Sequence, residues 1–167
     1  MQKHYLSVLV ENHEGVLARV SSLFCQRGFN IDSLTVSATN DPDVSRITIT
    51  AQGDDQAFLQ ILKQTEKLVE TKMIFSLDPS TSLLRELLLV KVEANETNRG
   101  ELQTIAQIYK SKIIDLSIGS MVFELTGEPD KIDGFLQVLS PYTILEMCRT
   151  GITALERGSN SHLLNSN

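Results

Sequence analysis

Hydrophobic and polar positions in the first half of the chain follow two periods, one typical of strands and one of helices. Residues 5–12 form an apolar run of strand length, and apolar side chains then recur at helical spacing over 16–24. Residues 31–38 and 47–51 alternate between apolar and polar side chains, and Asn, Asp and Pro residues separate them. The pattern predicts a strand, a helix and a β-hairpin in that order.

A second helix and a fourth strand complete the first half. Gly28 follows the first helical pattern, where a left-handed residue commonly ends a helix. Gly53 interrupts the hairpin, and Asp54 is a suitable N-cap for a helix with apolar positions over 58–62. A strand over 69–75 follows, so the predicted order is βαββαβ.

The second half repeats this order after residues 78–83, which contain Pro and small hydroxyl side chains without periodicity. Its predicted elements are a strand in 84–94, a helix in 102–109, strands at 113–118 and 121–126, a helix from Pro129 to Leu139 and a strand in 142–148. Each half is therefore expected to form a four-stranded antiparallel sheet with two helices on one face, an α+β fold. The other face of each sheet would be bare, which predicts dimerisation.

Composition excludes several classes of protein. The 167 residues are 41% apolar and 22% charged, which is ordinary for a globular chain. The formal charge of −6 and the lack of a basic stripe argue against a nucleic-acid partner. We find no apolar stretch of membrane-spanning length and no signal-peptide pattern. Cys25 and Cys148 are expected to be buried free thiols, which suggests a reducing, cytoplasmic compartment.

No catalytic or metal-binding pattern is recognisable. His4, His13 and His162 are not spaced as a set of metal ligands. A nucleophile elbow, a phosphate loop and a dinucleotide-binding glycine motif are all missing from the sequence. Ser45 and Arg46 are interpreted as part of the solvent face of the hairpin. The sequence thus predicts no catalytic residues.

The segment Asn12-His13-Glu14-Gly15-Val16-Leu17 lies between the first strand and the first helix. Glycine allows close approach of the backbone to a ligand, and free amides at a helix start can accept a carboxylate. The Asn12 side chain could cap the helix or bind the charged groups of an amino acid. From spacing alone, a structural turn with an Asn cap remains the more common explanation.

Six segments together resemble the small subunit of acetolactate synthase. They are LSVLVENHEGVLARVSSLFCQRGFNIDSLTV at 6–36, NDPDVSRITIT at 40–50, RELLLVKV at 85–92, SKIIDLS at 111–117, ELTGEPDKIDGFL at 124–136 and RTGITALERG at 149–158. The resemblance implies two tandem ferredoxin-like modules: an ACT domain at 4–77, a linker at 78–83, the family's own C-terminal domain at 84–158 and a disordered tail at 159–167. The predicted elements agree with that fold.

The resemblance also implies a function. The family's effector site falls on Asn12, Gly15, Val16 and Leu17 of one chain, with Asn30 and Ile31 supplied by the second chain of an ACT dimer. The effector would be valine or another branched-chain amino acid. Its binding would inhibit a catalytic subunit that this chain otherwise activates, in branched-chain amino-acid biosynthesis.

Cofactors and metals are expected on the partner and not on this chain. The resemblance places thiamine diphosphate, Mg²⁺ and FAD on the catalytic subunit, in the cytoplasm. Two alternatives remain open: a free-standing ACT-type amino-acid sensor without an enzyme partner, and a small acylphosphatase-like hydrolase. The latter is disfavoured because the loop from Asn12 to Gly15 contains no Arg to hold a phosphate.

Overall fold

The computed structural model describes residues 2–158, which form two compact units. The first unit contains residues 2–83 and 151–158, and the second contains 84–150. Residues 151–158, which follow the second unit in the sequence, belong to the first unit. The predicted disordered tail at 159–167 lies outside the described residues.

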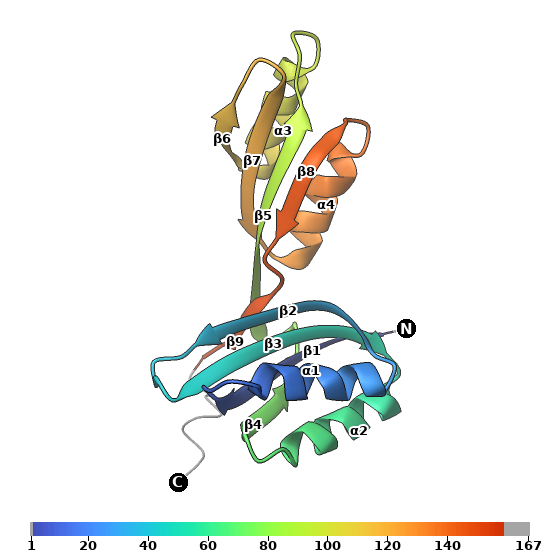
Figure 1. Ribbon diagram of the computed structural model, residues 1–167. Coiled ribbons are helices and arrows are strands. Elements are labelled where there is room, and N and C mark those ends of the chain that lie inside the picture. The colour runs from blue at the N-terminus through green and yellow to red at the C-terminus, as the bar shows by residue number, and fades with distance from the viewer. Residues whose placement is uncertain (1, 159–167) are drawn as a thin grey trace. The chain divides into compact units, whose positions relative to one another are not determined.

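The first unit is a four-stranded antiparallel sheet with two helices on one face (Figure 1). Its elements are β1 (Gln2–Glu11), α1 (Val16–Gln26), β2 (Asn30–Ala38), β3 (Val44–Gly53), α2 (Asp55–Glu66) and β4 (Thr71–Ser76). The strand order is β2-β3-β1-β4. Asp54 caps α2 by accepting hydrogen bonds from two backbone amides at 2.9 Å, as predicted. Gly28 ends α1 with a φ of 73°.

The second unit repeats this topology, which confirms the predicted α+β fold of two ferredoxin-like modules. Its elements are β5 (Ser82–Glu93), α3 (Arg99–Tyr109), β6 (Lys112–Leu116), β7 (Ser120–Gly127), α4 (Pro129–Leu139) and β8 (Ile144–Arg149). The strand order β6-β7-β5-β8 matches that of the first sheet, strand for strand. Pro129 opens α4, where its missing amide hydrogen costs nothing.

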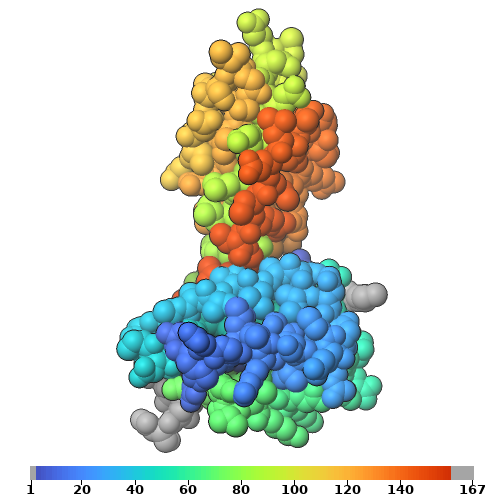
Figure 2. Space-filling model, in the orientation of Figure 1, coloured from blue at the N-terminus to red at the C-terminus, as the bar shows by residue number. Residues whose placement is uncertain are grey.

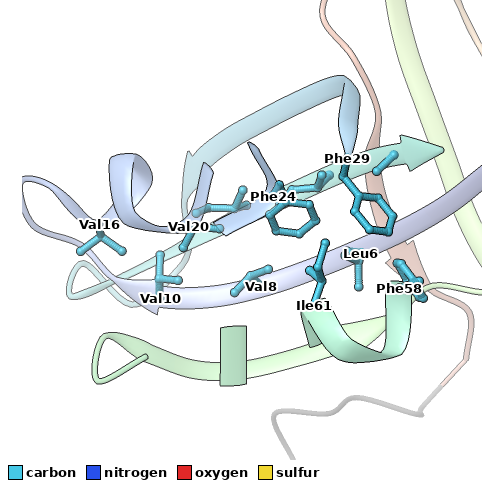
Figure 3. Close-up of a cluster of buried hydrophobic side chains, with 12 residues drawn as sticks. Leu6, Val8, Val10, Val16, Val20, Phe24, Phe29, Phe58 and Ile61 are labelled. Carbon is cyan, nitrogen blue, oxygen red and sulfur yellow. The ribbon is translucent and has the colours of Figure 1, made fainter. Parts of the chain in front are cut away.

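Each unit has its own hydrophobic core between the sheet and the helices. In the first unit, Val16, Val20 and Phe24 of α1 are spaced four apart and face the alternate apolar residues of β1 (Figure 3). In the second unit, the same alternation buries Leu88, Val90 and Val92 of β5. Burial of both cores follows from the two periods in the sequence.

A short strand that the sequence did not reveal, β9 (Thr153–Glu156), belongs to the first unit and pairs with β5, whose first two residues belong to the same unit. Ile152 and Ala154 are buried, at 2% and 4% exposed. Nη1 of Arg46 donates a hydrogen bond of 3.1 Å to the carbonyl of Ala154. Arg46 lies opposite Leu9 in the β1–β3 register, on the face away from the helices. The returning segment therefore covers part of the sheet face that was expected to be bare.

Arg46 and Ser45 were both expected to face solvent, and that interpretation is wrong. Arg46 is half-buried, and burial lowers its pKa while the charge of Glu156 opposes this shift. Ser45, on the opposite face of β3, is only 8% exposed. The alternation in β3 was correct, but both of its faces are covered, by the helices on one side and by the returning segment on the other.

The two cysteines were also expected to be buried, and both are exposed. Cys25 follows Phe24 on α1 and so points about 100° away from the buried stripe. Cys148 pairs with Leu89, on the side of β5 opposite the buried Leu88 and Val90. Apolar neighbours in the sequence therefore did not indicate burial of these thiols.

We expect Arg46→Met to release the returning segment. Loss of a charged donor to a partly buried carbonyl should cost about 1–2 kcal/mol. Amide hydrogens of residues 153–156 should then exchange roughly 5- to 30-fold faster, measured by hydrogen–deuterium exchange with mass spectrometry. Arg27→Met is the matched control, because Nε of Arg27 donates to Oε1 of Gln64 at 3.0 Å in a solvent-exposed hydrogen bond. Unchanged exchange in the Arg46 variant would show that β9 is held without this contact.

Candidate effector site

The loop between β1 and α1 lies at one end of the first unit's sheet and is exposed. Asn12, His13, Glu14 and Gly15 are all exposed, and Figure 2 shows this region in blue at the surface. Gly15 is the N-cap residue of α1 and has a φ of 83°, a conformation that glycine adopts without strain. The predicted glycine turn is therefore confirmed.

The start of α1 has no side-chain cap. Gly15 supplies none, and the first turn contains no acidic residue. The first intrahelical bond joins the amide of Arg19 to the carbonyl of Gly15 at 3.1 Å. Amides of a first turn have no partner within the helix, so those of residues 16–18 depend on solvent or a ligand. Such amides, together with the helix dipole, favour a carboxylate.

Asn12 neither caps the helix nor points freely into solvent. Its Nδ2 donates to the carbonyl of Pro42 at 2.8 Å, and its Oδ1 accepts from Oγ of Ser45 at 2.9 Å. Its backbone amide donates to the carbonyl of Asp43 at 2.9 Å. Asn12 therefore ties the loop before α1 to the β2–β3 turn.

The remaining predicted residues divide between the core and the surface. Val16 is 3% exposed and belongs to the hydrophobic core, whereas Leu17 is 42% exposed at the start of the helix. Asn30 is exposed at the beginning of β2, where its Nδ2 donates to Oδ1 of Asp32 at 3.2 Å. Ile31 packs against the core and is only partly buried. Leu17 and Asn30 are thus accessible, whereas Val16 is not.

One chain does not bring these six residues together. Glu11 pairs with Val44 of β3, whereas Asn30 pairs with Gln52 of the same strand. Eight residues of extended strand separate those two positions, a distance of roughly 25 Å. Asn12 and Asn30 therefore lie at opposite ends of the sheet. A site that contains both requires a second copy of the chain.

Charged groups surround the loop. His13 approaches the carbonyl of Glu14 at 3.0 Å with Nδ1 and Oε2 of Glu11 at 3.1 Å with Nε2. The backbone carbonyl, and then the Glu11 side chain, raise the pKa of His13 above its ordinary value. Arg19 forms an ion pair with the buried Glu70. A basic side chain therefore lies beside each of two carboxylates near the helix start.

Sequence reasoning missed the partners of the two asparagines and the Arg19–Glu70 pair. Ser45 is 33 residues from Asn12, and Glu70 is 51 residues from Arg19. The pairing of β1 with β3 brings Ser45 to Asn12, whereas the packing of α1 on the sheet brings Arg19 to Glu70, directly before β4. Asp32 is the exception, because its position two residues after Asn30 makes a local hydrogen bond a common arrangement.

Two negative findings concern the described residues alone. Among residues 2–158, no group of three or more His, Cys, Asp or Glu side chains could hold a metal ion. Over the same range, no helix is long and apolar enough to cross a membrane.

Comparison with known proteins identifies relatives along nearly all of this sequence. Residues 6–72 match a family model described as the small subunit-like ACT domain of AHAS, and residues 85–158 match the small subunit of acetolactate synthase. A probable acetolactate synthase small subunit of Archaeoglobus fulgidus is 45% identical over 94% of this chain and 98% of its own length. The acetolactate synthase small subunit of Mycolicibacterium smegmatis is 45% identical over 93% and 91%.

A solved structure extends the similarity to the fold. The crystal structure of the acetolactate synthase small subunit of Thermotoga maritima matches with a TM-score of 0.85 at 38% sequence identity. The match covers 95% of this chain and 99% of that one. The similarity in sequence and the similarity in fold therefore both extend over the two units.

Proposed function

Because the chain belongs to the family of acetolactate synthase small subunits, we propose that it activates a separate catalytic subunit and makes that subunit sensitive to valine. Thiamine diphosphate, Mg²⁺ and FAD would be bound by the catalytic subunit, which would condense two molecules of pyruvate, or pyruvate with 2-oxobutyrate. The complex would act in the cytoplasm, in the biosynthesis of valine, leucine and isoleucine. This chain would contribute regulation and no catalytic group.

The observation that carries the effector site is the uncapped start of α1 at an exposed glycine turn. The carboxylate of the amino acid would bind the amides of residues 16–18, where a helix terminus contributes about 0.3–2 kcal/mol. Burial of a valine-sized side chain against Leu17 and the partner's apolar residues adds about 1.5–3 kcal/mol. After the entropy of association is subtracted, these terms fit a sensor of roughly millimolar to micromolar affinity.

A homodimer of first units would complete the site. Since Asn12 and Asn30 lie at opposite ends of one sheet, a two-fold axis between two sheets would bring Asn12 of one chain toward Asn30 and Ile31 of the other. Valine would then contact both chains. It would alter activity only through a difference in affinity between two conformations, and a coupling of about 1–3 kcal/mol corresponds to roughly 5- to 150-fold regulation.

The direct test is acetolactate formation by the catalytic subunit from the same organism. The rate is measured with and without this chain, and each mixture is assayed with and without valine. We expect stimulation by this chain and reversal of that stimulation by valine. If this chain stimulates the catalytic subunit and valine has no effect, the effector assignment is refuted but the proposed partner is supported. No change in any mixture would favour a free-standing amino-acid sensor.

A further inference from the structure

The orientation of the Asn12 amide follows from the chemistry of its two neighbours. The carbonyl of Pro42 can only accept a hydrogen bond, so the atom 2.8 Å from it must be the amide nitrogen. The amide oxygen then faces Oγ of Ser45 at 2.9 Å, where the hydroxyl is able to donate. A flipped amide would place two acceptors against each other at Pro42. The network therefore allows one orientation.

The Ser45 hydroxyl comes from a rigid part of the first unit. Ser45 lies on β3, a central strand, where it pairs with Val10 of β1 and Ala38 of β2. It is 8% exposed, whereas Asn12 belongs to an exposed loop. The backbone of Asn12 is fixed separately by its hydrogen bond to Asp43. Rotation of the side chain is the remaining freedom, and Ser45 together with Pro42 removes it.

We propose that Ser45 is a positioning residue for effector binding. Its hydroxyl holds the amide of Asn12 in the orientation that the effector meets beside the start of α1. Ser45 acts only through Asn12 and does not itself contact the effector. With these bonds made, the amide keeps one N–H and one oxygen lone pair free for a ligand. The inference rests on the proposed function, because it assumes that Asn12 binds the amino acid.

The test is calorimetric titration of the full-length chain with valine. Ser45→Ala removes the donor at little change in volume, and we expect it to weaken binding about 3- to 10-fold, the usual range for one hydrogen bond. Ser45→Thr keeps the hydroxyl and should restore most of the affinity. Ser37→Ala is the matched control, because Ser37 is exposed on the neighbouring strand β2, opposite Arg46. It should bind as the wild type does.

A second readout follows Asn12 itself without any ligand. The two side-chain amide protons of Asn12 should give distinct, well-resolved NMR signals in the wild type and in Ser45→Thr. In Ser45→Ala they should shift or broaden, while the thermal midpoint stays within a few degrees. A merely structural role for Ser45 would lower the midpoint and leave these two signals unchanged.

The outcomes separate the inference from the function on which it rests. If the wild-type chain binds no valine or other branched-chain amino acid, the proposed effector site is wrong and the inference falls with it. If the wild type binds valine and Ser45→Ala binds it equally well, only the inference is overturned. Weaker binding in Ser45→Ala with unchanged Asn12 signals would also overturn it, because the loss would then arise elsewhere.

Discussion

Gly15→Asp is expected to abolish inhibition by valine while the catalytic subunit is still activated. A side chain at this position meets no atom within 4 Å of its Cβ, so the substitution fits the space. The new carboxylate would lie against the uncapped amides of α1, where we place the carboxylate of the effector. Two like charges about 4 Å apart repel by roughly 4 kcal/mol near a protein surface, enough to weaken binding at least about 100-fold. Valine titrations of acetolactate formation measure the effect.

Gly15→Asn separates charge from backbone strain. Asparagine has nearly the shape of aspartate and tolerates the positive φ of 83° comparably well, but it carries no charge. We expect it to weaken valine inhibition much less than Gly15→Asp does. If both variants lose inhibition equally, the backbone conformation of Gly15 matters and the charge does not. If Gly15→Asp keeps normal sensitivity, the effector site is elsewhere.

Arg149→Met is expected to destabilise the second unit by about 3–5 kcal/mol, because it leaves Glu86 buried without its counter-charge. The side chain of Glu86 is 5% exposed and forms an ion pair with Arg149, whose Nη1 also donates to Asp133 at 2.7 Å. Burial lowers the pKa of Arg149, but the two carboxylates outweigh that effect and the pKa lies above its ordinary value. Urea unfolding measures the loss of stability, and hydrogen exchange of the amides in β5 and β8 shows where it occurs.

Lys91→Met provides the matched control on the same pair of strands. Lys91 forms an ion pair of 3.2 Å with Glu146, and their side chains are 40% and 74% exposed. An exposed pair of this kind contributes about 0–1 kcal/mol. If both variants lost a similar amount of stability, burial would not explain the contribution of the ion pair between Arg149 and Glu86.

Local chemistry made most of the fold predictable from the sequence. Asp54, Pro129 and Gly28 each mark a helix end through properties of one residue, and all three occupy the expected positions. The Gly15 turn was predictable for the same reason. Helix ends and turns that depend on the properties of one residue were therefore anticipated correctly.

Contacts between distant segments were not predictable in this way. The hydrogen bond from Ser45 to Asn12 depends on the register of β1 with β3, and the burial of Arg46 depends on a strand more than 100 residues later. β9 has only four residues, too few to show a clear period. For the effector residues, the sequence identified candidates, but only the register showed that Asn12 and Asn30 lie at opposite ends of the sheet.

The return of residues 151–156 to the first unit makes the second unit an insertion within the first. During synthesis on the ribosome, the sheet β2-β3-β1-β4 emerges long before the segment that covers its open face. About 70 residues, 84–150, must leave the exit tunnel in between. That face, which carries Leu9 and Arg46, therefore stays uncovered on the nascent first unit, and its final packing would await translation of β9.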